Sequence, residues 1–188
     1  SVPLSSVTVG VPKESFTNEK RVALTPEGAE RLIKSGFAKV IVEKNAGKEG
    51  DILNEQYEKV GAKIVDTDTV FSEADVILKV RAPNENELEK IRPGTKLISF
   101  IQPGIHKGLV ENIRERGITA YAMDQIPRIT RAQTFDALSS MANTAGYKAV
   151  ICAAENFGRF FTGQITAAGR LPPAKVLVIG GGVAGLSA

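Results

Sequence analysis

The stretch VTVGVPKESFTNEKRVALTPEGAERLIKSGFAKVIVE (7–43) has the pattern of one strand–helix–strand unit. VTVGV (7–11) and KVIVE (39–43) are short runs rich in Val and Ile, as buried parallel strands are. Between them, Thr25 can cap a helix that begins with the proline after it, and Gly36 can end that helix. Two strands joined through a helix predict a right-handed crossover within a parallel sheet.

Short apolar runs of the same kind recur along the chain and alternate with amphipathic segments. Asn54 and Gly61 bracket one candidate helix, Pro83 opens another, and Gly117 closes a third. The further strand candidates are AKIVD (62–66), DVILKV (75–80), KLISFI (96–101), ITAYAM (118–123) and KVLVIG (175–180). This alternation predicts the α/β class, with a Rossmann-like, doubly wound parallel sheet.

The pattern changes after the sixth of these strands. From Gln133 to about Phe161 apolar residues recur at steps of three and four, which is the helical period. This segment is longer than any earlier helix candidate and rich in Ala, and Pro172 and Pro173 stop any helix after it. We therefore predict three parts. They are a Rossmann-like subdomain (1–132), a connecting long helix and turn (133–170), and the first strand and phosphate loop of a second, NAD-binding subdomain (171–188).

Three glycines follow the last strand candidate in the pattern G-x-G-x-x-G. Gly180 would permit the tight turn, Gly182 would let a pyrophosphate approach the backbone, and Gly185 would let helix and strand pack closely. With Val183 and Ala184 between the last two, they form a predicted dinucleotide site at a helix N-terminus. The alternative is a plain glycine-rich turn.

The sequence stops three residues after Gly185, before the acidic residue that would bind the adenosine ribose. A first strand and turn without the rest of its sheet buries too little surface to stand alone. We therefore expect a fragment, cut within its nucleotide-binding subdomain, that binds a dinucleotide poorly by itself.

Composition excludes several classes of protein. The net charge is only +3 and the charges are scattered, so we expect no nucleic-acid partner. The single cysteine, Cys152, rules out an internal disulfide and is expected in the core. No secretory signal and no apolar run of about 20 residues is visible, which predicts a soluble chain. No residue set has metal-ligand spacing, and no side chain is expected to act as acid, base or nucleophile.

The segment RITRAQTFDALSS (128–140) is more polar than a simple turn requires. It holds two arginines, a glutamine, an aspartate and several hydroxyl residues between a strand and a long helix. On a helix starting near Gln133, Asp136 and Ser139 would share one face. The simpler interpretation is that Asp136 only complements the helix dipole and that Thr134 is the N-cap.

Three stretches, GVPKESFTNEKRVALTP (10–26), VILKVRAP (76–83) and VIGGGVAGLSA (178–188), resemble the alanine dehydrogenase and transhydrogenase superfamily. The resemblance covers nearly the whole chain and implies one of two activities. In the alanine dehydrogenase pattern an arginine, here Arg21, holds the substrate carboxylate, and a lysine, here Lys79, contacts the substrate. A histidine assists proton transfer, and its position holds Gln102, which has no titratable proton near neutral pH. That departure argues against an amino-acid dehydrogenase.

The segments AMDQIPRITRAQTFDALSSMANTAGYKAV (122–150) and NFGRFFTGQITAAG (156–169) resemble the proton-translocating NAD(P) transhydrogenase branch. The resemblance implies that this loop closes over the nicotinamide end of NAD(H). Arg128 and Gln133 would hold the carboxamide and ribose side, while Asp136 and Ser139 would fix that geometry. Hydride would pass to NADP(H) held by a separate domain, so positioning carries the catalysis.

The resemblance also implies partners and a location. It implies association with the NADP-binding and transmembrane domains of the same enzyme, a homodimer, and hydride transfer coupled to proton translocation. The domain would be peripheral to a membrane, on the bacterial cytoplasmic or mitochondrial matrix side. Arg21 and Lys79 are then expected in structural ion pairs, and His106 in an exposed loop. The alternatives are an NAD-dependent alanine dehydrogenase and a non-catalytic nucleotide-binding module.

Overall fold

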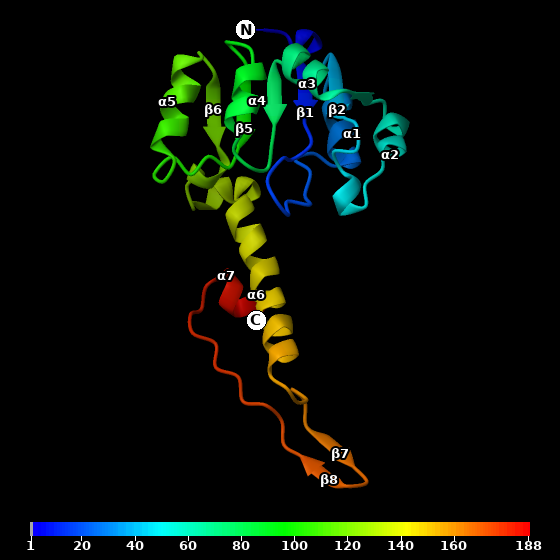
Figure 1. The fold of residues 1–188 in the computed structure, drawn as a ribbon, viewed down its shortest axis with the longest axis vertical. Helices are drawn as coiled ribbons and strands as arrows, with labels where there is room; N and C mark the ends of the chain where they lie inside the picture. Colours follow the sequence, from blue (N-terminus) through cyan, green and yellow to red (C-terminus); the bar gives the residue numbers. More distant parts are fainter. Residues whose placement is uncertain (1) are drawn as a thin grey trace. The chain divides into compact units, whose positions relative to one another are not determined.

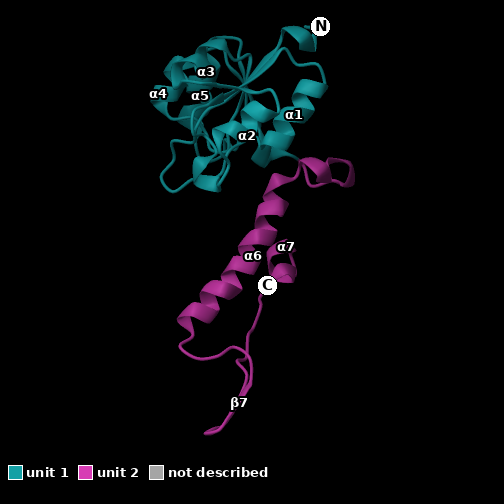
Figure 2. Cartoon of the chain, turned by 90° about the vertical axis from the view of Figure 1, so that its right-hand side faces the viewer, with its two compact units in different colours: residues 1–126 teal, residues 127–188 magenta. Residues whose placement is uncertain are grey.

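A computed structural model describes residues 2–188, which divide into two compact units (Figure 2). Unit 1 comprises residues 1–126 and unit 2 comprises residues 127–188. The boundary lies after Ile126, whereas we expected it after residue 132. The polar segment 128–140 therefore belongs with the long helix that follows it.

Unit 1 is built on a six-stranded parallel sheet (Figure 1). The strands are β1 (Thr8–Val11), β2 (Lys39–Glu43), β3 (Lys63–Val65), β4 (Val76–Leu78), β5 (Lys96–Ser99) and β6 (Thr119–Ala122). Their order is β3-β2-β1-β4-β5-β6, which is that of a doubly wound nucleotide-binding fold. The α/β, Rossmann-like prediction is confirmed, and all six strands lie within the predicted segments.

The helices of unit 1 start and stop at local signals. They are α1 (Pro26–Lys34), α2 (Asn54–Lys59), α3 (Thr67–Glu73), α4 (Glu85–Lys90) and α5 (Lys107–Glu115), with short 3-10 turns η1 (Leu4–Ser6), η2 (Lys48–Gly50) and η3 (Met123–Gln125). The Thr25 hydroxyl accepts from the Gly28 N–H (3.2 Å), and Gly36 ends α1 with φ +93°, both as predicted. Helix α3 was not predicted; Asp66 caps it by accepting from the Thr69 N–H (2.8 Å).

Helices cover both faces of the sheet, and each face has its own core. In Figure 2, α1 and α2 lie on one side of the sheet and α3, α4 and α5 on the other. One core includes Val9, Val11, Val40, Val42 and Tyr57, and the other includes Phe71, Ile77, Leu88, Leu97 and Ile113. The buried Tyr57 hydroxyl donates to the Leu24 carbonyl (2.6 Å), and burial raises its pKa to about 12.

The strand order reverses between β1 and β4. The crossovers from β1 toward β2 and from β4 toward β5 lead to opposite edges of the sheet. In open α/β sheets, ligands bind outside the carboxyl ends of the strands at such a point. The segments that follow β1 and β4 are therefore the first place to look for a site in unit 1.

Unit 2 consists of η4 (Thr130–Phe135), α6 (Ala137–Asn156), β7 (Gln164–Thr166), β8 (Gly169–Leu171) and α7 (Val183–Ser187). Helix α6 is the predicted long helix, but it begins at Ala137 rather than near Gln133 because Asp136 caps it. The antiparallel hairpin of β7 and β8 was not predicted. None of the helices in residues 2–188 combines the length and apolarity needed to cross a membrane.

The prediction of a strand at 175–180 is wrong for this chain. The segment has no hydrogen-bonded partner strand within residues 2–188, and Leu177 and Ile179 are 84% and 90% exposed. A strand is stabilised by its neighbours in a sheet, and the chain supplies none here.

Candidate functional site

The carboxylate of Glu14 joins the segments that follow β1 and β4. It accepts from the N–H groups of Val80 (2.6 Å) and Arg81 (3.2 Å). One of its oxygens also lies 3.3 Å from the Lys79 Nζ. Two sequence motifs that lie far apart in the chain, KES and VILKVRAP, are thus held together by one buried acidic side chain.

Lys79 is enclosed between two buried carboxylates. Its Nζ lies 3.0 Å from Glu87 Oε1 as well as 3.3 Å from Glu14, and its side chain is fully buried. Glu87 also accepts from the Ser15 hydroxyl (3.1 Å) and the Asn84 N–H (2.9 Å). The structural ion pair expected for Lys79 is present.

Glu19 holds two arginines at the same sheet edge. Arg21 binds it in a bidentate pair, with Nε and Nη2 each 2.7 Å from a carboxylate oxygen, and the Arg81 Nε also lies 2.7 Å away. The hydrogen bond from Arg21, with that from Arg81, lowers the pKa of Glu19 to about 2 against the effect of burial. The same carboxylate raises the pKa of Arg21. Arg21, like Lys79, is therefore engaged in an ion pair.

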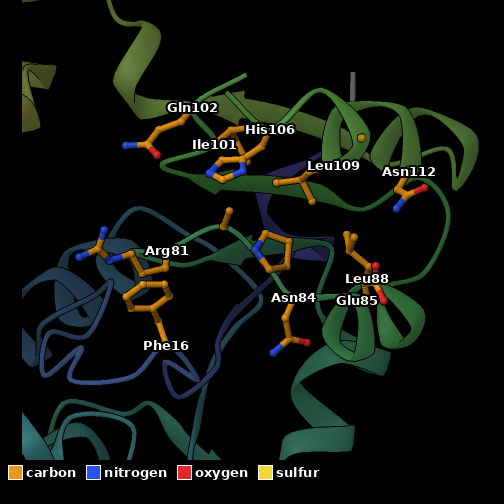
Figure 3. Close-up of a pocket in the computed structure, with 13 residues that line it drawn as sticks. Phe16, Arg81, Asn84, Glu85, Leu88, Ile101, Gln102, His106, Leu109 and Asn112 are labelled. Carbon is orange, nitrogen blue, oxygen red and sulfur yellow. The ribbon is translucent and has the colours of Figure 1, made fainter. Parts of the chain in front are cut away.

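A cavity of about 690 Å³ lies beyond the ends of β4 and β5 (Figure 3). Its polar lining includes Arg81, Asn84, Gln102, His106 and Asn112. The Arg81 guanidinium lies over the Phe16 ring, 4.8 Å from its centroid. Sequence reasoning singled out only Gln102 and His106 here. For Phe16 and Arg81 the available signal was their place in the segments that follow the neighbouring strands β1 and β4.

The backbone at Gln102 is held in an uncommon conformation, with φ +52°. The Asp124 carboxylate accepts from the N–H groups of Ile101 (2.7 Å) and Gln102 (3.1 Å), and the Gln102 carbonyl accepts from His106 (3.0 Å). Burial opposes the charge on Asp124, but hydrogen bonds from Gln125 and these N–H groups outweigh it and lower its pKa. His106 is exposed, as expected. None of the predicted cofactor residues lines this cavity.

The predicted nicotinamide-binding residues lie in unit 2, where Asp136 and Ser139 meet. Asp136 accepts from the Ser139 N–H (2.9 Å) and hydroxyl (2.6 Å), and caps α6 in place of Thr134. These two hydrogen bonds, with the charge of Arg128, lower the pKa of Asp136. Arg128 and Gln133 are exposed, and within the described part of the chain their side chains form no hydrogen bond or ion pair.

The glycine loop has the local geometry that the three glycines predict. Gly180 has φ +110°, which a tight turn requires. A Cβ on Gly182 would meet nothing within 4 Å, so a ligand can approach the backbone there. A Cβ on Gly185 would overlap the Gly180 carbonyl, so the turn closes only around a glycine. Val183 and Ala184 form the exposed first turn of α7.

Among residues 2–188, no three His, Cys, Asp or Glu side chains gather into a metal site. Cys152 is a free, half-buried cysteine on α6. Arg128, Gln133 and the backbone at Gly182 are accessible from solvent.

Two family models match the chain. "Alanine dehydrogenase/PNT, N-terminal domain" matches residues 10–145, and "Alanine dehydrogenase/PNT, C-terminal domain" matches residues 149–188.

Individual proteins agree with these matches. The chain is 51% identical over 181 residues to NAD(P) transhydrogenase subunit alpha of Cereibacter sphaeroides, covering 96% of the chain and 34% of that protein. It is 34% identical to alanine dehydrogenase of Mycolicibacterium smegmatis, in a match that covers 96% of the chain and 49% of that protein. The solved structure of a transhydrogenase from Sinorhizobium meliloti matches with a TM-score of 0.92 and 43% identity, covering 96% and 51%. The chain thus spans about a third to a half of the length of these relatives.

Proposed function

The chain belongs to the alanine dehydrogenase/PNT family, and from that premise we propose that it is the N-terminal part of an NAD(H)-binding domain of a transhydrogenase. In this proposal the whole protein passes hydride between NAD(H) and NADP(H). The observation that carries it is the 51% identity, over 96% of the chain, to a transhydrogenase alpha subunit, against 34% to an alanine dehydrogenase.

The glycine loop suits the pyrophosphate of a dinucleotide. Gly182 leaves open space where a Cβ would stand, and the positive φ of Gly180 turns the chain sharply before α7. The backbone N–H groups of Gly182, Val183 and Ala184 would hold the phosphate oxygens. The residues present therefore fit the cofactor.

Arg128 and Gln133 would hold the nicotinamide end. Their side chains are exposed and, within residues 2–188, form no hydrogen bond or ion pair with other protein groups. Asp136 and Ser139 instead hydrogen-bond to each other and fix the first turn of α6. The bound cofactor supplies the hydride, while these side chains orient the ring that carries it.

The alanine dehydrogenase alternative has less support from the residues. Gln102 stands where that activity places a proton-transferring histidine, and an amide does not titrate near neutral pH. Lys79 is enclosed by Glu14 and Glu87 rather than free for a substrate.

As a transhydrogenase, the whole protein would associate with an NADP-binding domain and a membrane domain that couples the reaction to proton translocation. It would form a homodimer, on the bacterial cytoplasmic or mitochondrial matrix side.

The test is hydride transfer by the full-length protein. We expect NADH to reduce an NADP analogue, and alanine to yield no NADH from NAD. Arg128→Ala should lower hydride transfer at least as much as it weakens NADH binding, because orientation is lost with the guanidinium. Arg131→Ala is the matched control, since Arg131 is exposed on the same segment and is assigned no role.

Alanine-dependent NADH formation would favour the dehydrogenase. NADH binding without any hydride transfer would favour a non-catalytic module. Unchanged turnover of the Arg128 variant at saturating NADH would contradict the orienting role.

A further inference from the structure

Helices α6 and α7 touch through a glycine within unit 2. Gly146 is the buried residue of α6. A Cβ at this position would overlap the carbonyl group of Ala184, in the first turn of α7. Any side chain at residue 146 would therefore force the two helices apart.

One hydroxyl group, shared between two acceptor oxygens, links the two helices one turn away. The Ser187 hydroxyl lies 2.8 Å from the Asn143 carbonyl and 3.0 Å from the Asn143 Oδ1. Asn143 precedes Gly146 by three residues, so both lie on one face of α6. The contact thus combines a close backbone approach at Gly146 with a hydrogen bond from Ser187 to Asn143.

The two ends of the contact carry the two halves of the predicted cofactor site. Helix α7 begins directly after the glycine loop 180–182. Asp136 caps α6, and Ser139 lies in its first turn. Gly146 follows Ser139 by seven residues, which at the helical rise is about 10 Å along the axis. The docking of α7 on α6 therefore sets the separation between the phosphate loop and the polar segment.

We propose that Gly146 is a positioning residue for hydride transfer: its missing side chain sets how closely the phosphate loop approaches α6, and so where a dinucleotide held by that loop presents its nicotinamide. This inference rests on the proposed function. It assigns Gly146 no contact with the cofactor. Asn143 and Ser187 hold the same contact in register.

The test compares Gly146→Ala with Ala145→Ser in the full-length protein. Each adds one heavy atom to α6, but Ala145 is exposed. Alanine favours a helix more than glycine does, so helix propensity alone predicts an equally or more stable variant. Three quantities are measured: thermal unfolding without cofactor, the NADH dissociation constant by fluorescence titration, and the rate of hydride transfer.

We expect Gly146→Ala to slow hydride transfer by roughly ten- to a hundredfold, because small displacements of reacting groups are costly. The NADH dissociation constant should change much less, since the loop itself is intact. Ser187→Ala removes the hydrogen bond to Asn143 without introducing a clash. It should likewise lower the rate of hydride transfer more than it changes the NADH dissociation constant, but to a smaller degree. Ala145→Ser should match the wild type in all three measurements.

Wild-type turnover in Gly146→Ala would overturn the inference. A loss of rate, affinity and thermal stability together in both Gly146→Ala and Ser187→Ala would also overturn it, since that is a purely structural role. The wild type alone tests the proposed function. If alanine rather than NADH proves to be its hydride donor, the rate of each variant relative to the wild type is measured in the alanine-dependent reaction instead. A wild type that transfers hydride in neither assay would overturn both.

Discussion

Replacing Lys79 with methionine tests whether the buried ion cluster is structural. The change removes the one cation within 3.0 to 3.3 Å of Glu87 and Glu14 and leaves two carboxylates facing each other in the interior. Removing one partner of a buried ion pair typically costs about 3–5 kcal/mol of unfolding free energy.

Both carboxylates keep other donors after the substitution. Glu14 retains the N–H groups of Val80 and Arg81 as donors. Glu87 retains the Ser15 hydroxyl and the Asn84 N–H. We therefore expect a loss near the lower end of the range, about 3 kcal/mol. For a domain of about 150–250 residues that is a fall in Tm of roughly 6–12 °C.

The assay is thermal unfolding of the full-length protein, followed by circular dichroism, with hydride transfer measured below the variant's Tm. Lys90→Met is the matched control, because Lys90 pairs with Asp68 at the surface, and its Tm should stay close to that of the wild type. Adding Glu14→Gln and Glu87→Gln to Lys79→Met should recover much of the loss.

A wild-type Tm in Lys79→Met would refute the structural interpretation of the cluster. A folded variant with normal NADH binding but no hydride transfer would refute it differently, by placing Lys79 in substrate binding. We expect neither, because Lys79 has no exposed side-chain surface.

Two further outcomes follow from the same geometry. The carboxyl of Glu19 has a pKa of about 2 in the folded chain against an ordinary 4.5, so its contribution to stability is present above pH 4.5 and lost as pH falls toward 2. The difference in Tm between wild type and Glu19→Gln should shrink across that window, and a constant difference would contradict the assignment. Gly182→Ala should weaken NADH binding by roughly tenfold or more without lowering Tm, because the added methyl meets no protein atom but occupies the approach to the backbone. Gly104→Ala, in an equally open position of unit 1, should leave NADH binding unchanged.

The sheet of unit 1 could be predicted from the sequence because its strands are short, buried and apolar. Val9, Val11, Val40 and Val42 all come from Val- and Ile-rich runs and form one core. Helix α1 carried explicit signals at Thr25 and Gly36. Helix α3 was missed because its only clear start signal, the Asp66 cap, stands in a short polar segment between two predicted strands.

The links between distant segments could not be predicted from one sequence. Nothing in the run around Glu14 indicates that its carboxylate will meet the N–H groups of Val80 and Arg81. The prediction of a strand at 175–180 failed because a strand also needs a neighbour. The apolar pattern of the segment is that of a strand, but the described chain holds no partner strand for it.

The sequence singled out the polar segment 128–140, but the roles of its residues within the fold needed the structure. Periodicity placed Asp136 and Ser139 on one helix face, whereas the structure makes Asp136 the cap and Ser139 the residue that it holds. Of the four predicted cofactor residues in this segment, Arg128 and Gln133 are the two whose side chains form no hydrogen bond or ion pair within residues 2–188. The division between residues that build the loop and residues that can bind a ligand therefore emerges from the hydrogen bonds, not from spacing.

The most direct test of the account is a crystal structure of the full-length protein with bound NADH. We predict the pyrophosphate on the backbone of Gly182 to Ala184, and Arg128 and Gln133 within hydrogen-bonding distance of the nicotinamide carboxamide or its ribose. The ring face opposite them would be open toward a second dinucleotide. A structure in which Arg128 and Gln133 point into solvent, far from the nicotinamide, would contradict the account.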